Sequence, residues 1–145
     1  MEAAAGEAQG VDLRLAFDCR LKLEFHGTKV TSDGGLLACR ELDDALGLSE
    51  KTAGEVLTDT RTGANGRHSL VGQFRQSVFG RLAGYEDVND ADRLAHDPAM
   101  CWVVGGRAVA EQAASTSQMG RFETKWLCRP ENLAALADLP GESTP

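Results

Sequence analysis

The sequence predicts a mainly helical fold: a small helical domain with a short β segment near its N-terminus and a helix-turn-helix-like element near residues 107–128. Three observations favour this fold class. Apolar residues recur at helical spacing in several segments, most clearly over 68–83. Side chains that cap helices precede many of these segments, and glycines follow several of them. Strict alternation of polar and apolar residues, which is typical of a half-buried strand, occurs over 20–26 (RLKLEFH).

Two helices are expected after the strand. The first spans 35–46 and ends at Gly47. Three residues before it offer N-cap side chains: Thr31, Ser32 and Asp33. Its buried apolar stripe is expected to consist of four leucines: Leu36, Leu37, Leu42 and Leu46. The second helix is expected to start from a Ser49 N-cap and to run to about residue 58, where a polar, glycine-bearing loop begins.

The clearest helix of the sequence is expected over 68–83. Its core-facing residues recur at helical spacing: Leu70, Val71, Phe74, Val78 and Leu82. Shorter helices are expected over 107–113 and 117–128, and ENLAALADL at 131–139 favours a last turn or two. The chain then divides into three parts: a disordered lead-in (1–12), one domain (13–128) and a divergent or frayed tail (129–145).

Residues 84–98, GYEDVNDADRLAHDP, gather five carboxylates and one histidine. A calcium-binding loop that begins at Asp87 would lack the glycine and the glutamate that such loops require. A zinc site would need another histidine or cysteine at short spacing from His96. Helix capping explains the run better, because Asp87 can cap a short helix and Asp97, followed by proline, can cap the next. The run is therefore expected to hold no metal and no catalytic residue.

Net charge is −7, which argues mildly against a nucleic-acid partner. The charge is unevenly distributed, however: residues 60–85 carry +4 and residues 99–130 carry +2, while the acidic run between them carries −4. No apolar run approaches the roughly 18–20 residues that a membrane helix needs. The four cysteines lie too far apart in sequence for a metal knuckle, so buried, reduced thiols are expected.

The second basic block contains a stretch, VAEQAASTSQMGRFE (109–123), that can be aligned with a helix-turn-helix pattern. The turn would lie near Ala113, Ser115 or Ser117 would cap the second helix, and Met119 would face the core. Four side chains would project outward: Gln118, Arg121, Lys125 and, beyond them, Arg129. The alternative is an ordinary solvated helix, because similar patterns are common in helical proteins.

The first basic block consists of four arginines and His68: Arg61, Arg67, Arg75 and Arg81. Arg61 and Arg67 lie in a glycine-bearing loop, which can follow a phosphate backbone. The alternative is a charged loop next to two arginines that extend from the borders of an apolar helix face.

Three segments carry a resemblance to a known family: VTSDGGLLACRELDDALGL (30–48), RHSLVGQFRQSVFGRLAGYEDVNDADRLAHDPAM (67–100) and ASTSQMGRFE (114–123). They resemble the N-terminal part of bacterial DDE-type insertion-sequence transposases, in particular the group named transposase DDE domain, group 1. GYEDVNDADRLAHDP is the most specific piece. The resemblance covers about residues 25–125.

The resemblance implies a family that cuts and rejoins DNA at element ends, using an Asp-Asp-Glu triad and two magnesium ions on an RNase H-like fold. The first catalytic aspartate would follow the Arg-Phe-Glu segment at 121–123. Here the chain continues as TKWLCRPENLAALADLPGESTP, without a β-branched run that ends in Asp-x-Asp, and Asp138 is given no role. We therefore expect a truncated or degenerate copy that is inactive alone and holds no cofactor, with magnesium expected only for the missing domain.

The expected function is DNA binding in the bacterial cytoplasm, at the nucleoid. The expected partners are double-stranded DNA at element ends and, in addition, this chain itself or full-length transposase, with no membrane. Eight candidate DNA-binding residues follow from the two basic blocks: Arg61, Arg67, Arg107, Ser117, Gln118, Arg121, Lys125 and Arg129. One alternative is an oligomerisation fragment that regulates or inhibits full-length transposase without binding DNA, which the acidic net charge favours. Another is a standalone helix-turn-helix regulator.

Overall fold

Helices make up most of the computed structural model, which describes residues 13–23 and 34–139. The larger helices are α1 (Gly35–Leu46), α3 (Leu70–Leu82) and α8 (Pro130–Asp138). The shorter ones are α2 (Leu48–Glu50), α4 (Ala91–Leu94), α5 (Pro98–Val104), α6 (Arg107–Ala110) and α7 (Thr116–Arg121). Wider π-helical turns extend α2 and α7 as η1 (Lys51–Val56) and η4 (Phe122–Leu127), and two 3₁₀ turns lie in connections, η2 (Gly63–Gly66) and η3 (Val88–Asp90). The expected mainly helical fold class is confirmed.

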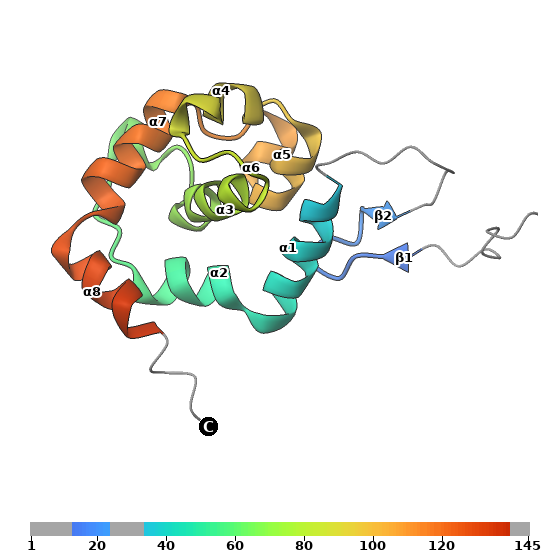
Figure 1. Ribbon diagram of the computed structural model, residues 1–145, viewed down its shortest axis with the longest axis horizontal. Coiled ribbons are helices and arrows are strands. Elements are labelled where there is room, and N and C mark those ends of the chain that lie inside the picture. Colours follow the sequence, from blue (N-terminus) through green and yellow to red (C-terminus); the bar gives the residue numbers. More distant parts are fainter. Residues whose placement is uncertain (1–12, 24–33, 140–145) are drawn as a thin grey trace, which may run out of the picture.

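A minimal antiparallel ladder lies beside the helices (Figure 1). It pairs β1 (Leu13–Arg14) with β2 (Lys22–Leu23), with Leu13 opposite Leu23. The strand expected over 20–26 is therefore not shown at its expected length, since two of its residues pair and 24–26 lie outside the described residues. The N-caps expected at Thr31, Ser32 and Asp33 also lie outside them.

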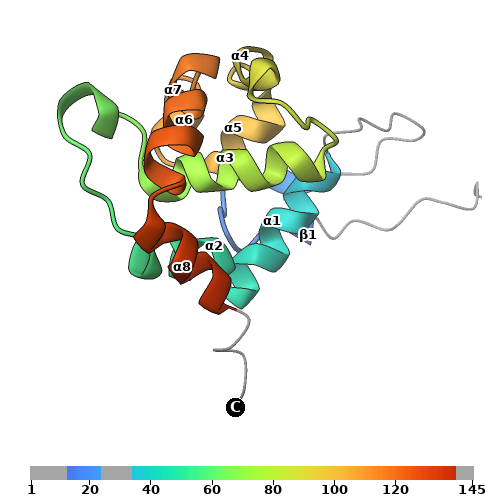
Figure 2. The same cartoon turned by 60° about the vertical axis from the view of Figure 1, so that its left-hand side comes forward.

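Helix α3 runs through the middle of the molecule between two groups of helices (Figures 1 and 2). Helices α1, α2 and α8 lie on one side of it, and α4, α5, α6 and α7 lie on the other. One apolar cluster, around Phe79, Met100 and Val103, packs α3 against α5. A second cluster, around Leu70 and Phe122, joins α3 to η1 and η4. The two clusters fix the elements that carry the candidate site.

Helix α1 has the expected bounds but not the expected buried face. It ends at Gly47, whose φ of 65° is the left-handed conformation that glycine adopts readily. Leu36 is buried as expected, whereas Leu42 and Leu46 are 60% and 59% exposed, so the predicted leucine stripe is wrong at these two positions. Arg40 is buried instead. Its Nε donates to a backbone oxygen of α5, and its guanidinium stacks over an aromatic ring, so a charge fills part of the core-facing side.

Ser49 lies inside α2 and does not cap it, so the predicted N-cap is wrong. Its buried hydroxyl donates to Asp43 Oδ2 at 2.5 Å and accepts from Arg75 Nε at 2.8 Å. Because these partners belong to α1 and α3, a side chain that the sequence suggested as a local cap in fact connects three helices.

Helix α3 begins at a Ser69 N-cap, whose side chain accepts from a backbone N–H in the first turn. Leu70 is buried as expected, but Val78 and Leu82 are 39% and 62% exposed, so the predicted core-facing stripe is wrong in the second half of the helix. The buried face is instead largely polar, with three such side chains beside Phe79: Gln73, Gln76 and Ser77.

The capping explanation of the acidic run is confirmed. The Asp87 carboxylate accepts from Asn89 N at 3.0 Å at the start of η3. The Asp97 carboxylate accepts from Met100 N at 2.8 Å at the start of α5, which also begins with a proline. Within residues 13–23 and 34–139, no group of three His, Cys, Asp or Glu side chains is placed to hold a metal ion.

Residues 130–138 form the packed helix α8, which confirms the last helical turns expected over 131–139 and shows that the tail predicted as divergent or frayed over 129–145 is ordered there. Asn132, 1% exposed, fixes this helix: its Oδ1 accepts from Thr58 N at 2.8 Å and its Nδ2 donates to Trp126 O at 2.8 Å. Residues 140–145 lie outside the described part of the chain.

The four cysteine thiols are free. Cys19, Cys39 and Cys128 are exposed and Cys101 is half-buried, so the predicted burial is wrong for the first three. Burial raises the pKa of the Cys101 thiol, which keeps it protonated at neutral pH. None of the described helices combines the length and apolar character needed to cross a bilayer.

Candidate nucleic-acid interface

The segment expected to resemble a helix-turn-helix is built around α7. Ser115 caps this helix, because its Oγ accepts from Gln118 N at 3.4 Å while Gln118 Oε1 accepts from Ser115 N at 2.8 Å. Met119 is buried, as expected. Before the cap, Ala113 and Ala114 form a buried, non-helical link to the single turn of α6. A helix-turn-helix role for this segment stays a prediction.

The buried amides of α3 hold the start of α7 in place. Gln76 Nε2 donates to Ala114 O at 2.7 Å, and Gln76 Oε1 accepts from Ala114 N at 2.9 Å. Gln73 Nε2 donates to Gln118 O at 3.5 Å. Buried backbone groups that lack helical partners are costly unless they are bonded, and Gln76 satisfies both groups of Ala114.

The acidic run also positions α7. Asp92 Oδ1 accepts from Thr116 N at 2.8 Å, and Thr116 Oγ1 accepts from Asp92 N at 3.3 Å. Thr116 Oγ1 also lies 3.3 Å from Asn89 O, within donating distance. Thr116 is the first residue of α7, where a carboxylate is favoured by the partial positive charge of the helix end.

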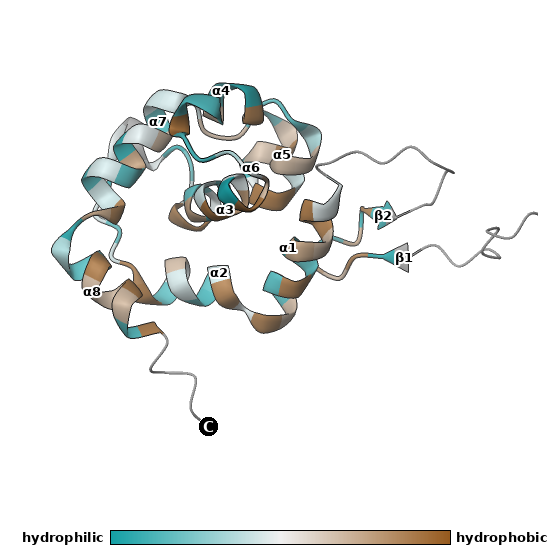
Figure 3. Cartoon of the chain, viewed as in Figure 1, coloured by the Kyte–Doolittle hydropathy of each residue, from teal (hydrophilic) through white to brown (hydrophobic). Residues whose placement is uncertain are grey.

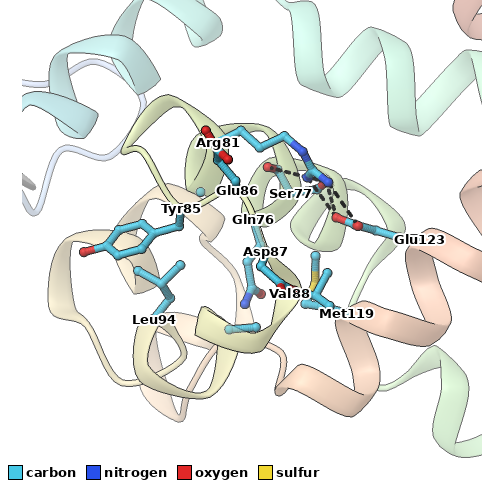
Figure 4. Close-up of a pocket in the computed structure, with 12 residues that line it drawn as sticks. Gln76, Ser77, Arg81, Tyr85, Glu86, Asp87, Val88, Leu94, Met119 and Glu123 are labelled. Atoms are coloured by element: carbon cyan, nitrogen blue, oxygen red, sulfur yellow. Dashed lines mark hydrogen bonds and ion pairs between the residues drawn. The ribbon is translucent and has the colours of Figure 1, made fainter.

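A second set of polar contacts fixes η4, the segment that continues α7. Figure 4 shows the Arg81 guanidinium and the Ser77 hydroxyl directed at the Glu123 carboxylate, across a small pocket lined by the acidic run. Arg81 Nη1 lies 2.9 Å and Ser77 Oγ 2.7 Å from Glu123 Oε1. Burial raises the pKa of Glu123, but the hydrogen bonds from Arg81 and Ser77 outweigh it and hold that pKa below its ordinary value. The ion pair therefore joins two of the three segments that carry the family resemblance, 67–100 and 114–123.

A cavity of about 140 Å³ lies beside α7. Side chains from the 58–68 loop, α3, α7 and η4 line it: Arg61, Arg67, His68, Gln73, Gln118, Arg121 and Trp126. Four of these are candidate DNA-binding residues from the sequence, so the fold brings residues from both basic blocks to one place. No carboxylate belongs to this lining.

Arg61 forms a fixed wall of the cavity. Its side chain is 2% exposed, and its Nε and Nη2 donate to the two oxygens of Asp59 at 2.8 and 2.9 Å. Its Nη1 donates to Gln73 Oε1. The side chain is thus held at three nitrogens before any ligand arrives, in the bidentate geometry that arginine forms with carboxylates.

Arg67 and Arg107 share one carboxylate at the edge of the cavity. Arg67 Nη2 lies 3.3 Å and Arg107 Nε 2.9 Å from Glu111 Oε2. Both arginines are about half exposed, at 51% and 49%. Two cations facing one anion leave a positive charge uncompensated at this edge.

Three cations follow at four-residue spacing from the end of α7, through η4, to the residue that precedes α8: Arg121, Lys125 and Arg129. Arg121 and Lys125 are exposed, and neither forms an ion pair with any residue that the structure describes. Arg121 Nε donates to the backbone oxygen of Ser117, itself exposed one turn earlier. Arg129 Nη1 donates to Thr60 Oγ1 at 2.6 Å, and its guanidinium stacks over Trp126.

His68 lies against this positive region, 8% exposed. Burial is the largest cause that lowers its pKa below the ordinary value, and the nearby charges of Arg67 and Arg107 lower it further. The sequence placed His68 in the first basic block but not among the candidate binding residues, and it did not single out Gln73 or Trp126. No local pattern marks Gln73 or Trp126, because the fold brings them to the cavity from separate elements.

A second surface feature, the apolar groove, lies between α1, α2 and α3. It has a volume of about 420 Å³ and is lined mainly by aliphatic and aromatic side chains: Cys39, Leu42, Leu48, Phe74, Val78 and Leu82, with Asp43, Ser49, Thr52 and Phe79. Figure 3 colours the α1–α2 junction brown at the outer edge of the molecule. Four of these residues are 39–62% exposed, which is unusual for large apolar side chains that lie together.

The comparison with family models identifies the class of protein to which this helical arrangement belongs. The model of the transposase DDE domain, group 1, matches residues 13–141. The match covers most of the chain, so the chain belongs to this family of DDE-type transposases. No curated protein and no solved structure matches the chain.

Proposed function

We propose that this chain binds double-stranded DNA through a basic face formed by Arg67, Arg107, Arg121, Lys125 and Arg129. The observation that carries the proposal is the gathering of both basic blocks around one cavity without a carboxylate in its lining. Membership of a transposase family supports DNA as the polyanion. The net charge of −7 does not oppose this, because electrostatic attraction acts locally over about 8–10 Å at physiological salt.

The candidate residues take different parts in the proposed interface. Arg121 and Lys125 are exposed and have no carboxylate partner among the described residues, so both are available to contact phosphates. Arg67 and Arg107 share the carboxylate of Glu111. Ser117 is exposed at the start of α7 and is available to a DNA backbone or base edge. Arg61 and Gln118 shape the site, since their polar atoms are engaged within the protein.

Salt dependence of binding tests this function. The logarithm of the affinity for a labelled duplex should fall linearly with log salt, with a slope of about −4 to −5 if the five cations of the basic face contact phosphates. Arg121→Gln and Lys125→Gln should each reduce the size of the slope by about 1. Arg20→Gln, two residues before the strand β2, which Figure 1 shows on the opposite side of the molecule from α7, should leave the slope unchanged. A slope near zero for the unaltered chain would contradict the proposal.

Recognition of element ends is the more specific part of the proposal. A duplex carrying the terminal inverted repeat of the element should compete for binding roughly tenfold better, or more, than a scrambled duplex of equal length. Equal competition at physiological salt would restrict the function to non-specific DNA binding.

A second candidate function is contact with another transposase chain, and the apolar groove favours it. An unpartnered groove of about 420 Å³ rimmed by leucines is typical of a protein-binding surface. In this case the chain would form dimers, or mixed dimers with full-length transposase, in the absence of DNA. Light scattering shows whether the chain is a dimer and whether Leu82→Gln dissociates it. Such a dimer, together with no salt-dependent DNA binding, would favour this candidate over the first.

A further inference from the structure

We infer that the cavity between Arg61, Arg67 and Arg121 is a pocket for a single phosphate group. This inference rests on the proposed DNA-binding function, because DNA supplies the phosphate. It goes further in placing one phosphate at one defined point of the basic face, which would set the register of the DNA on the protein. We call this cavity the phosphate pocket.

Three guanidinium groups line the phosphate pocket, two from the 58–68 loop and one from α7. The carboxylates that pair with Arg61 and Arg67, Asp59 and Glu111, are not part of the lining. Arg121 has no carboxylate partner among the described residues, and its Nε bond to a backbone oxygen leaves both terminal nitrogens as donors. Guanidinium groups match the oxygens of phosphate in charge and in geometry.

The pocket is held in shape before a ligand binds. Arg61 is almost completely buried and is bonded at Nε and both terminal nitrogens. Gln118 Oε1 accepts from Ser115 N, which fixes this side chain at the pocket wall. A site whose donors are already fixed loses little side-chain freedom when it binds an anion.

Size and local potential agree with an anionic ligand. The volume of about 140 Å³ far exceeds the roughly 10–15 Å³ that a single water molecule requires, so a polyatomic anion can enter. Burial is the largest cause that lowers the pKa of His68, and the charges of Arg67 and Arg107 lower it further, while Glu111 partly offsets them.

Trp126 lines the pocket and provides a direct readout of binding. In a Trp102→Phe background, Trp126 is the remaining tryptophan, and its fluorescence can be followed while inorganic phosphate is added at constant ionic strength. A saturable change with phosphate, absent with chloride, is expected. Arg121→Gln should weaken phosphate binding roughly tenfold or more, because it removes a charge-assisted hydrogen bond.

Lys125→Gln is the matched control, since it removes one positive charge from the same run of three cations but outside the pocket. It should lower the affinity for DNA while leaving phosphate binding unchanged. If phosphate gives no saturable signal, or if Lys125→Gln weakens it as much as Arg121→Gln does, the pocket is refuted, although salt-dependent DNA binding would still stand. Loss of salt-dependent DNA binding itself would refute the proposed function.

Two sources of the phosphate are distinguished with duplexes of one sequence, with and without a 5′-phosphate. If a terminal phosphate occupies the pocket, the phosphorylated duplex binds several-fold more tightly, and Arg121→Gln removes that difference. If a backbone phosphate occupies it, the two duplexes bind equally, and inorganic phosphate competes with both at matched ionic strength. Either result supports the pocket, and absence of both the 5′-phosphate preference and the competition overturns it.

Discussion

Gln76 uses both ends of its amide to bind a single residue, Ala114, and both residues are buried. Gln76→Ala would leave the N–H and C=O of Ala114 without partners in the core. We expect a loss of about 2–4 kcal/mol in the free energy of unfolding, measured by chemical denaturation. Gln112→Ala, at an exposed position two residues from Ala114, serves as the control and should change stability little. Equal effects of the two substitutions would contradict the assigned role of Gln76.

His68 predicts a pH dependence of stability. Its folded pKa is lowered by burial and by neighbouring arginines, so the unfolded chain binds the proton more readily than the folded one. The stability that neutral His68 contributes is therefore fully present above the ordinary pKa of 6.5. It is lost as pH falls through the lowered pKa of the folded state. Denaturation at a series of pH values should show stability decreasing with falling pH in this window.

The control for this pH dependence is a pair of histidine substitutions. His68→Gln should flatten the decrease below pH 6.5, whereas His96→Gln, at an exposed site, should retain it. A decrease that is identical in both variants would assign the titration to other groups.

The residues that sequence reasoning placed correctly act locally, and those that it missed act across the fold. Asp87, Asp97 and Ser115 cap helices that begin one residue later, so sequence distance is enough to assign them. Gln73 and Gln76 bond to residues more than 35 positions away, which no local pattern reveals.

At the scale of elements, the acidic run acts as a support for α7. Asp92→Ala would remove the carboxylate that binds the first N–H of that helix. We expect a loss of about 0.5–2 kcal/mol in stability and faster hydrogen exchange at the Thr116 amide. Asp90→Ala, in the same run but without a capping bond, is the control. Unchanged exchange at Thr116 in the Asp92 variant would rule out this support.

Helix α3 shows why its bounds could be predicted but not its orientation. The spacing of its apolar residues predicted a helix over 68–83, and the helix runs over 70–82. Its apolar residues fall on one side, and hydropathy alone would place that side inward. The inward side is instead the one whose amides and hydroxyls find partners on α7 and η4, leaving Val78 and Leu82 exposed along the apolar groove.

At the scale of the whole molecule, substitution in the core should destabilise the protein far more than substitution in the apolar groove. Phe79 is 3% exposed at the centre of one apolar cluster, and Phe79→Ala should cost about 3–5 kcal/mol of stability. Leu82→Ala, 62% exposed on the same helix, should change stability by no more than about 0.5 kcal/mol. Thermal or chemical denaturation of the two variants measures both effects. A large loss of stability for Leu82→Ala would mean that the apolar groove is covered in solution.

Whole-chain charge was the least informative sequence property for the candidate site. Acidic residues elsewhere dominate the total, while the fold brings Arg61, Arg67 and Arg121 to one cavity and places Arg107 on the carboxylate that Arg67 also contacts. Block charges along the sequence indicated this face, but the cavity and its Trp126 wall depend on contacts that only the folded chain makes.

The paired bonds between Gln76 and Ala114 also restrict how α7 can move. Packing between apolar helices tolerates sliding, because one methyl group can replace another at similar energy. An amide that binds a single N–H and a single C=O has no equivalent partner one helical turn away, about 5.4 Å along the axis. A force along α7 would therefore have to break both hydrogen bonds at once, and it could not shift the helix by small steps.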